Sequence, residues 1–256
     1  MNCDKRTFNF CHWLSDTHRQ DILHRFNIEN FPIQKEMTKN DYVIILGDFG
    51  IWDNSKEENY ILDWLDNKNF TTLFIDGNHE NYDLLNTYPY VEWCGGRVQP
   101  IRPSILHLCR GEVFNINGKI FFAMGGASSH DIKDGILEIG DPRIKEWRKD
   151  YTKLFRINHL SWWKEELPND EEMKNGLNNL DKVNNKVDYI LTHSPSNSEL
   201  ILLGGKGFYE FDKLTSYIDE IKARCEYKKH FFGHMHINKY INIQDICLYE
   251  DIIEVK

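Results

Sequence analysis

The sequence predicts an α/β protein with a mixed β-sheet. Short apolar runs of strand length recur along the chain, and each is soon followed by Asp, Asn or His. Amphipathic stretches with helical spacing lie between these runs, and this alternation is typical of α/β folds. A predicted antiparallel hairpin near the middle of the chain makes the sheet mixed.

Five apolar runs are predicted to be strands. They are rich in aromatic and β-branched residues and end in polar loops. The runs are residues 8–14, 42–46, 71–75, 187–191 and 230–232. Because loops at strand ends present side chains from a rigid base, the polar residues after these runs are candidates for a functional site.

Two amphipathic helices are predicted between the strands. Ser55 and Glu58 have the spacing of a capping box at a helix start. The apolar face that follows consists of Tyr60, Ile61, Trp64 and Leu65. The face of the second helix consists of Leu214, Tyr217, Ile218 and Ile221. Their i, i+3, i+4, i+7 spacing predicts a helix just before the last strand.

A hairpin is predicted in the middle of the chain. Residues 112–116 and 119–124 flank Asn117 and Gly118. This dipeptide suits the two positive φ angles of a type I′ turn, which joins antiparallel strands directly.

The segment 128–168 is interpreted as an insertion or lid over the site. Asp141 as a cap and Pro142 in the first turn predict a helix start within it. The apolar face of this helix is expected to comprise Ile144, Trp147, Tyr151 and Leu154. We expect the segment to shape substrate access and to contribute little to metal binding.

Length and charge limit the kinds of protein this chain can be. A chain of 256 residues can bury its own core, and we expect a single domain spanning residues 1–256. A formal charge of −9 argues against binding extended nucleic acid, which depends on Lys and Arg neutralising phosphates. Bound divalent cations can nevertheless create a local site for phosphate.

The N-terminal region and the cysteines both suggest a cytoplasmic protein without a membrane partner. The apolar run from Thr7 to Leu14 is too short and too interrupted for a signal peptide or a membrane span. The six cysteines are scattered and form no CxxC pair, so we expect free thiols.

Ligand-type side chains follow all five predicted strands. Taken one at a time, each could be a turn, cap or core residue. They are Asp16 and His18, Asp48 after Gly47, Asn78 and His79 after Gly77, His193, and His234 and His236 after Gly233. Their occurrence at five strand ends of one chain favours a shared centre for two ions, which needs a bridging carboxylate and further nitrogen and oxygen ligands.

These ordered motifs resemble those of the calcineurin-like metallophosphoesterase superfamily, and the resemblance covers most of the chain. It implies a four-layer α-β-β-α sandwich with two facing mixed sheets and a metal site at the strand C-terminal ends. It also implies that Asp48 bridges two ions and that His79 binds no metal and faces the substrate phosphate. The other implied ligands are Asp16, His18 and His236 for the first ion, and Asn78, His193 and His234 for the second.

The chain departs from part of the superfamily pattern. Protein Ser/Thr phosphatases continue the second motif with an acidic residue and an arginine, whereas this chain reads Gly47-Asp48-Phe49-Gly50-Ile51-Trp52-Asp53. A phosphoprotein substrate is therefore disfavoured. The first motif ends in Arg19 where glycine is common. The segment after Gly125 resembles uncharacterised bacterial and phage members.

The expected activity is hydrolysis of phosphate mono- or diesters by a hydroxide that two metal ions activate. His79 would donate a proton or hydrogen bond to the leaving group, backed by Asp48 or Asp76. Ligands without thiolate suit Mn, Fe or Zn, as divalent or mixed-valence ions. Two other hypotheses stay open at this point: a non-catalytic scaffold with the same fold, and a nuclease acting on nucleic-acid ends.

The substrate is expected to be a small phosphorylated molecule, a class that includes nucleotides. His130 follows a glycine-rich loop in the insertion and is a candidate for contact with it. Arg102 and Arg156 are candidate phosphate-binding residues because guanidinium groups pair with phosphate oxygens.

Overall fold

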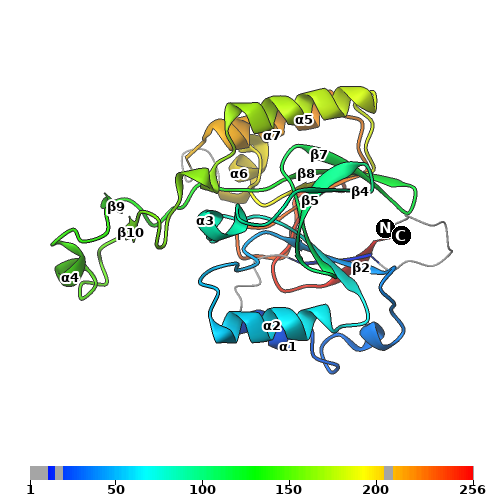
Figure 1. Cartoon of the computed structure of the whole chain (residues 1–256). Helices are drawn as coiled ribbons and strands as arrows, with labels where there is room; N and C mark the ends of the chain where they lie inside the picture. The colour runs from blue at the N-terminus through cyan, green and yellow to red at the C-terminus, as the bar shows by residue number, and fades with distance from the viewer. Residues whose placement is uncertain (1–10, 15–19, 205–209, 256) are drawn as a thin grey trace.

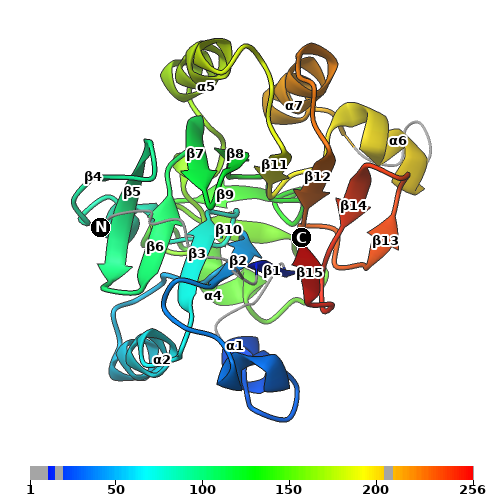
Figure 2. The same cartoon turned by 90° about the vertical axis from the view of Figure 1, so that its right-hand side faces the viewer.

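A computed structural model of the chain describes residues 11–14, 20–204 and 210–255. Two mixed β-sheets pack face to face, and helices cover their outer faces (Figure 1). Helices α1 (Gln20–Arg25) and α2 (Lys56–Asp66) lie on one side. Helices α5 (Asp170–Lys182) and α7 (Lys213–Arg224) lie on the other. This arrangement confirms the predicted four-layer fold class (Figure 2).

The first sheet has the strand order β15-β1-β2-β3-β6-β5-β4. Strands β1, β2, β3 and β6 are parallel, whereas β15 and β5 are antiparallel to their neighbours. In sheet order the bounds are Ile253–Val255, Cys11–Leu14, Tyr42–Leu46, Thr71–Ile75, Ile105–Leu108, Gly96–Arg102 and Val91–Trp93. Short helices η1 (Pro32–Lys35) and α3 (Tyr82–Leu85) lie in its connections.

The second sheet has the strand order β13-β14-β12-β11-β8-β7. Strands β14, β12, β11 and β8 are parallel, and β13 and β7 are antiparallel edges. In sheet order the bounds are Lys239–Tyr240, Asp245–Cys247, Lys229–Phe232, Tyr189–Thr192, Lys119–Met124 and Glu112–Ile116. Helix α6 (Asn197–Gly204) follows β11.

The core has three apolar layers, one between the sheets and one under each layer of helices. Strand β2 shows how one segment serves two of them: Ile44 and Leu46 pack between the sheets, whereas Val43 and Ile45 pack toward the helices. Because successive strand side chains point to opposite faces, a strand buried on both faces must be apolar throughout. The same rule explains why the central strands are continuous apolar runs in the sequence.

The hairpin and both amphipathic helices were predicted correctly. Asn117 and Gly118 have φ angles of 54° and 81°, as a type I′ turn requires. Ser55 caps α2 by accepting a hydrogen bond from the backbone N–H of Glu58. The face of α7 is buried as expected, but Tyr60 on α2 is 63% exposed, so it does not belong to the buried face.

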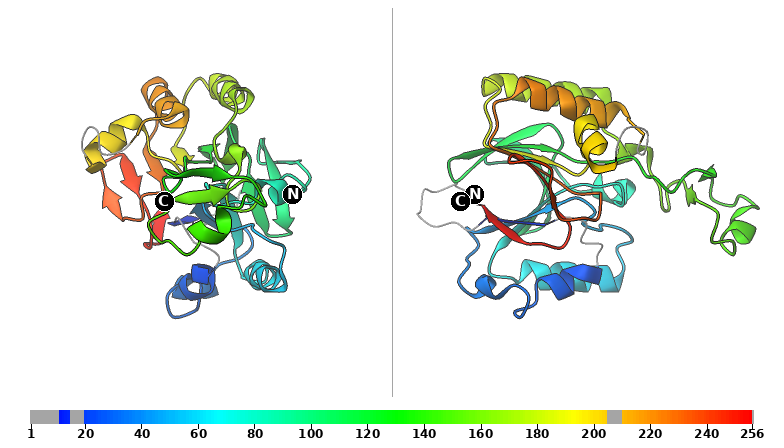
Figure 3. Two further views of the ribbon diagram at one scale, coloured as in Figure 1. Left: turned by 90° about the vertical axis from the view of Figure 1, so that its left-hand side faces the viewer. Right: turned by 180° about the vertical axis from the view of Figure 1, so that it is seen from behind.

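Residues 128–168 form an arm that projects away from the two sheets (Figures 1 and 3). It contains the parallel pair β9 (Gly135–Leu137) and β10 (Phe155–Ile157), with α4 (Ile144–Trp147) between them and η2 (Lys164–Glu166) near its end.

The prediction of a longer helix through Tyr151 was wrong. Tyr151 is 98% exposed, and the Asp150 carboxylate accepts hydrogen bonds from the Thr152 backbone and hydroxyl, which form a turn. Helices gain most of their stability from packing, and the arm tip offers no layer for a longer helix to cover.

The cysteine prediction holds only in part. Cys109, Cys225 and Cys247 are free thiols. Cys94 is disulfide-bonded. Within residues 11–14, 20–204 and 210–255, no helix combines the length and apolar character needed to cross a bilayer.

Candidate metal centre

The loops that follow β2, β3, β11 and β12 bring ligand-type side chains from both sheets together. Parallel strands end at the same edge of a sheet, so the residues after them become neighbours. His193, which follows β11 in the second sheet, contacts both Leu46 and Asp48 in the first. The centre therefore lies where the C-terminal ends of the two sheets meet.

Two glycines allow the loops to approach this closely. Gly47 has a φ of 91°, and a side chain there would overlap the His193 ring. A side chain at Gly77 would overlap the Asp48 carboxylate. Asp48 itself has a φ of 49°, and its Oδ1 accepts a hydrogen bond of 2.9 Å from the His79 backbone N–H. The left-handed backbone thus directs the buried carboxylate toward the second strand-end loop.

The two ring nitrogens of His193 face different neighbours. Its Nδ1 lies 2.7 Å from the Leu46 carbonyl oxygen, which can only accept, so Nδ1 carries the proton. Its Nε2 lies 3.4 Å from Asp48 Oδ1 and 3.3 Å from Asn78 Oδ1. A neutral His193 would offer Nε2 to a metal ion here, beside two oxygen atoms that can also bind one. The donor set therefore fits a transition-metal ion.

His234 lies beside this group, and its ring centroid is 5.0 Å from that of His193. Burial, followed by the neighbouring rings of His193 and His130, lowers the pKa of His234 well below its ordinary value. Its ring is thus neutral at physiological pH, which is the form that binds metal. The Nε2 atoms of His130 and His234 lie 2.8 Å apart, so one nitrogen donates and the other accepts.

His79 is contacted by the arm. Nη1 and Nη2 of Arg156 lie 3.3 and 3.4 Å from the two ring nitrogens of His79, so the guanidinium lies alongside the ring. The Arg156 Nε donates to both carboxylate oxygens of Asp131 at 2.9 Å. Its Nη1 donates to the Ser161 carbonyl at 3.0 Å. The arm therefore holds an arginine at the residue predicted to be catalytic.

Not every predicted site residue lies in this group. Asp16 and His18, two of the predicted ligands of the first ion, lie outside the described residues. His236 is exposed, with a φ of 50°, and its ring stacks on Tyr249 at 5.0 Å.

Arg102 lies at the opposite end of the first sheet. It pairs with Ile105 at the start of β6, and its guanidinium binds Asp63 and Asn59 on α2. The prediction that it contacts substrate is therefore not supported. Sequence alone could not reveal this, because direction in an antiparallel strand depends on pairing.

Glu80 is a buried residue of the centre to which sequence reasoning gave no role. It accepts hydrogen bonds from the backbone N–H groups of Phe49, Gly50 and Ile51, at 2.7 to 3.0 Å. Burial, and after it the negative charge of Asp48, raises the pKa of Glu80 to about 8, although the three backbone hydrogen bonds act to lower it. Glu80 thus shapes the loop after Asp48. Its position directly after Asn78 and His79 was the signal that could have revealed it.

Asp76 does not support the His79 ring, contrary to one of the two expectations. Its carboxylate accepts from Arg110 Nε at 2.8 Å and from Tyr82 at 2.8 Å, and it contacts His107 at 3.0 Å. Burial opposes ionisation, but Arg110, followed by His107, holds the pKa of Asp76 well below its usual range. Asp76 is thus a buried structural anchor at the end of β3.

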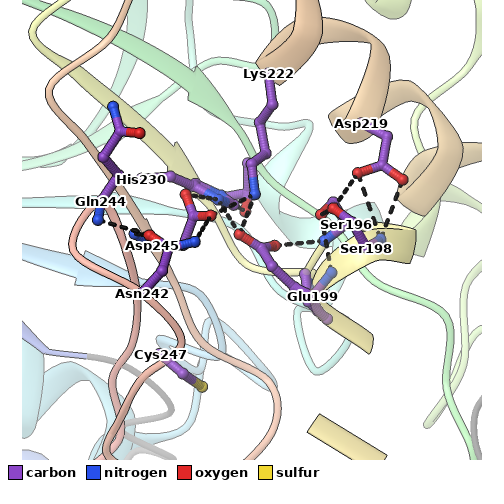
Figure 4. A network of polar contacts seen from close by, with 12 residues as sticks. Ser196, Ser198, Glu199, Asp219, Lys222, His230, Asn242, Gln244, Asp245 and Cys247 are labelled. Carbon is purple, nitrogen blue, oxygen red and sulfur yellow. Dashed lines mark hydrogen bonds and ion pairs between the residues drawn. The ribbon is translucent and has the colours of Figure 1, made fainter. Parts of the chain in front are cut away.

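A second group of ligand-type atoms lies behind the strand ends. Single ligand atoms of Glu199, His230 and Asp245 lie within 4.8 Å of one another, and all three residues are buried. The Lys222 ammonium lies 2.5 Å from Glu199 Oε1 and 3.0 Å from Asp245 Oδ2 (Figure 4). Lysine already supplies the cation that these carboxylates need, so we interpret the group as a buried ion-pair network and not as a metal site.

This network supports the strand end that carries His193. The Thr192 hydroxyl donates to the Ser194 carbonyl at 2.5 Å, so its oxygen accepts from His230 Nε2 at 2.8 Å. His230 Nδ1 lies 2.8 Å from Glu199, which can only accept. The ring donates at both nitrogens in this arrangement and carries a positive charge. His230 is completely buried, which agrees with a structural role.

Together, these features define an α/β protein in which nitrogen- and oxygen-bearing side chains of the kinds that bind metal ions gather at the ends of parallel strands. The family model for calcineurin-like phosphoesterases matches residues 12–238. The chain therefore belongs to the calcineurin-like phosphoesterase family, as the motif order indicated, and it is in general terms a metal-dependent phosphoesterase. Among curated proteins, none matches the chain in sequence.

Proposed function

We propose that the protein hydrolyses a small phosphate ester at a centre of two transition-metal ions. The observation that carries the proposal is the convergence of Asp48 Oδ1, Asn78 Oδ1 and His193 Nε2, with separations of 3.3 and 3.4 Å from the imidazole nitrogen. His234, held neutral, would complete one ion's ligands. Asp16, His18 and His236 would hold the other ion, and Asp48 would bridge both.

The ions would activate water and neutralise the phosphoryl oxygens. His79 lies at the edge of the centre, and its backbone is fixed by Asp48. It would donate a proton or hydrogen bond to the leaving oxygen, which contributes about 10²- to 10⁴-fold to the rate of such reactions. Arg156 beside it would bind a phosphoryl or leaving-group oxygen, because a guanidinium pairs with oxyanions in a fixed geometry.

A small substrate suits the charge of the protein. The formal charge of −9 disfavours extended nucleic acid, and Arg156, the cation beside His79, comes from the arm. His130 beside His234 would form a further wall of the substrate site. A nucleotide remains one member of this substrate class, and Mn, Fe and Zn all suit the ligands.

The experiment is metal analysis of the purified protein, followed by parallel assays on an aryl phosphate monoester and an aryl phosphodiester. We expect about two ions per chain and loss of turnover in chelator, with recovery when metal is restored. Two bound ions without turnover of any ester would favour the scaffold hypothesis. Absence of metal after growth in supplemented medium, with turnover retained in chelator, would contradict the proposal.

A further inference from the structure

The two ends of the arm meet beside the predicted ligand Asn78. Ser129 lies at the start of the arm and Glu166 near its end, 37 residues apart in the sequence. The Ser129 hydroxyl donates to Glu166 Oε2 at 2.6 Å, and its backbone N–H donates to Oε1 at 3.0 Å. Asn78, Ser129 and Glu166 are each at most 5% exposed. This contact is buried, and hydrogen bonds in a buried contact are electrostatically stronger than those exposed to water.

Donor and acceptor roles along this chain of contacts orient the Asn78 amide. A carboxylate only accepts, so the Ser129 hydroxyl proton points to Glu166. The Ser129 oxygen is then left to accept from Asn78 Nδ2, which lies 3.3 Å away. The amide oxygen consequently faces the opposite way, toward His193 Nε2. Since only the oxygen of an amide binds a metal ion, this orientation decides whether Asn78 can serve as a ligand.

We propose that Ser129 and Glu166 are positioning residues that hold the Asn78 amide with its oxygen toward the second ion, so that closure of the arm's two ends determines how tightly that ion binds. The inference rests on the proposed function, because it requires the metal centre. It also changes the role expected for the arm: its base acts on metal binding, while its tip does not. Ligand-supporting contacts of this kind change metal affinity by about 10- to 100-fold.

Glu166→Gln is the sharpest test because it keeps the shape of the side chain and reverses the donor and acceptor roles in its contacts with Ser129. The new amide oxygen would accept from the Ser129 backbone, and the new NH₂ would donate to the Ser129 hydroxyl. That hydroxyl would then give its proton to Asn78, and the Asn78 amide would turn its NH₂ toward the ion. Ser129→Ala removes the relay altogether, whereas Ser129→Thr retains a hydroxyl and is expected to preserve the orientation. Glu165→Gln, an exposed neighbour on the same 3-10 helix, is the matched control.

Metal binding would be measured by titrating metal-free protein with Mn²⁺ or Zn²⁺ in a calorimeter, with side-chain amide NMR of Asn78 as a second readout. We expect the wild type, Ser129→Thr and Glu165→Gln to bind two ions. Glu166→Gln and Ser129→Ala should keep one ion while the other binds about 10- to 100-fold more weakly, and the Asn78 NH₂ signals should shift in Glu166→Gln. Thermal melts would verify that each variant is folded.

The outcomes separate the inference from the proposed function. A wild type that binds no metal contradicts the proposed function itself. A wild type with two ions, together with folded Glu166→Gln and Ser129→Ala that bind both ions equally tightly, overturns the positioning role alone. Equal weakening in Glu165→Gln also overturns it, because the effect would then follow from loss of negative charge near the arm and not from the relay.

Discussion

The buried network around Lys222 supports a quantitative prediction. Lys222 is 10% exposed in its side chain and lies between Glu199 and Asp245, whose side chains are 1% and 7% exposed. Lys222→Met would leave two buried carboxylates facing one charged imidazole. Removing one partner from a buried network costs about 3–5 kcal/mol, because the remaining charge stays desolvated and uncompensated.

The pKa of the Glu199 carboxyl indicates a similar contribution of this network to the free energy of unfolding. Burial opposes its ionisation, but the charges of His230 and then Lys222 lower its pKa to about 2, from an ordinary value of 4.5. Such a difference corresponds to about 3 kcal/mol of folding free energy at neutral pH. In a domain of this size, a loss of 3–5 kcal/mol lowers the melting temperature by roughly 10 °C.

The assay is equilibrium unfolding in urea, with Lys186→Met as the matched control. Lys186 forms an ion pair of 2.8 Å with Glu226, but the two side chains are 67% and 76% exposed, so its loss should leave stability nearly unchanged. Adding Asp245→Asn to Lys222→Met restores the charge balance and should recover part of the loss. If Lys222→Met costs no more than Lys186→Met, the reasoning about buried charge is refuted.

His79→Asn should lower the turnover number by about 10²- to 10⁴-fold with unchanged metal content, and less so for a nitrophenolate leaving group; loss of metal would refute the role given to His79. Asp48→Asn should lower metal content along with rate, because a neutral bridge no longer compensates the repulsion between the ions; full metal content would argue against bridging. Replacing the arm tip, residues 139–153, with a short linker should change the preference among esters while metal analysis still finds both ions; unchanged turnover of every ester would exclude a role in access. Glu199 has a folded-state pKa below its unfolded value, so its contribution to stability is present above pH 4.5 and lost as pH falls toward 2. Acid unfolding should therefore be less steep over that range in Glu199→Gln, and identical profiles would contradict this.

Strand positions and ligand types could be read from the sequence because they depend on local pattern. Strands β2 and β3 match their predicted bounds, since a strand buried on both faces must be apolar along its whole length. The order of Asp48, Asn78, His193 and His234 after strand ends likewise indicated one centre, because parallel strands end at the same edge. The sequence shows Gly47 and Gly77 directly before candidate ligands, but only the structure shows that the His193 and Asp48 side chains approach these glycines too closely for any other residue.

Partners distant in the chain were decided only by the tertiary structure. Arg102 and Arg156 were equivalent candidates in the sequence, yet strand direction places one on α2 and the arm brings the other to His79. The contact of Ser129 with Glu166 spans the whole arm, and no local pattern encodes such closure. Through its short-range periodicity, the sequence thus determines which side chains lie at each strand end. Packing between segments far apart in the chain decides which of these side chains meet. It also decides which of two neighbours donates the proton in each hydrogen bond.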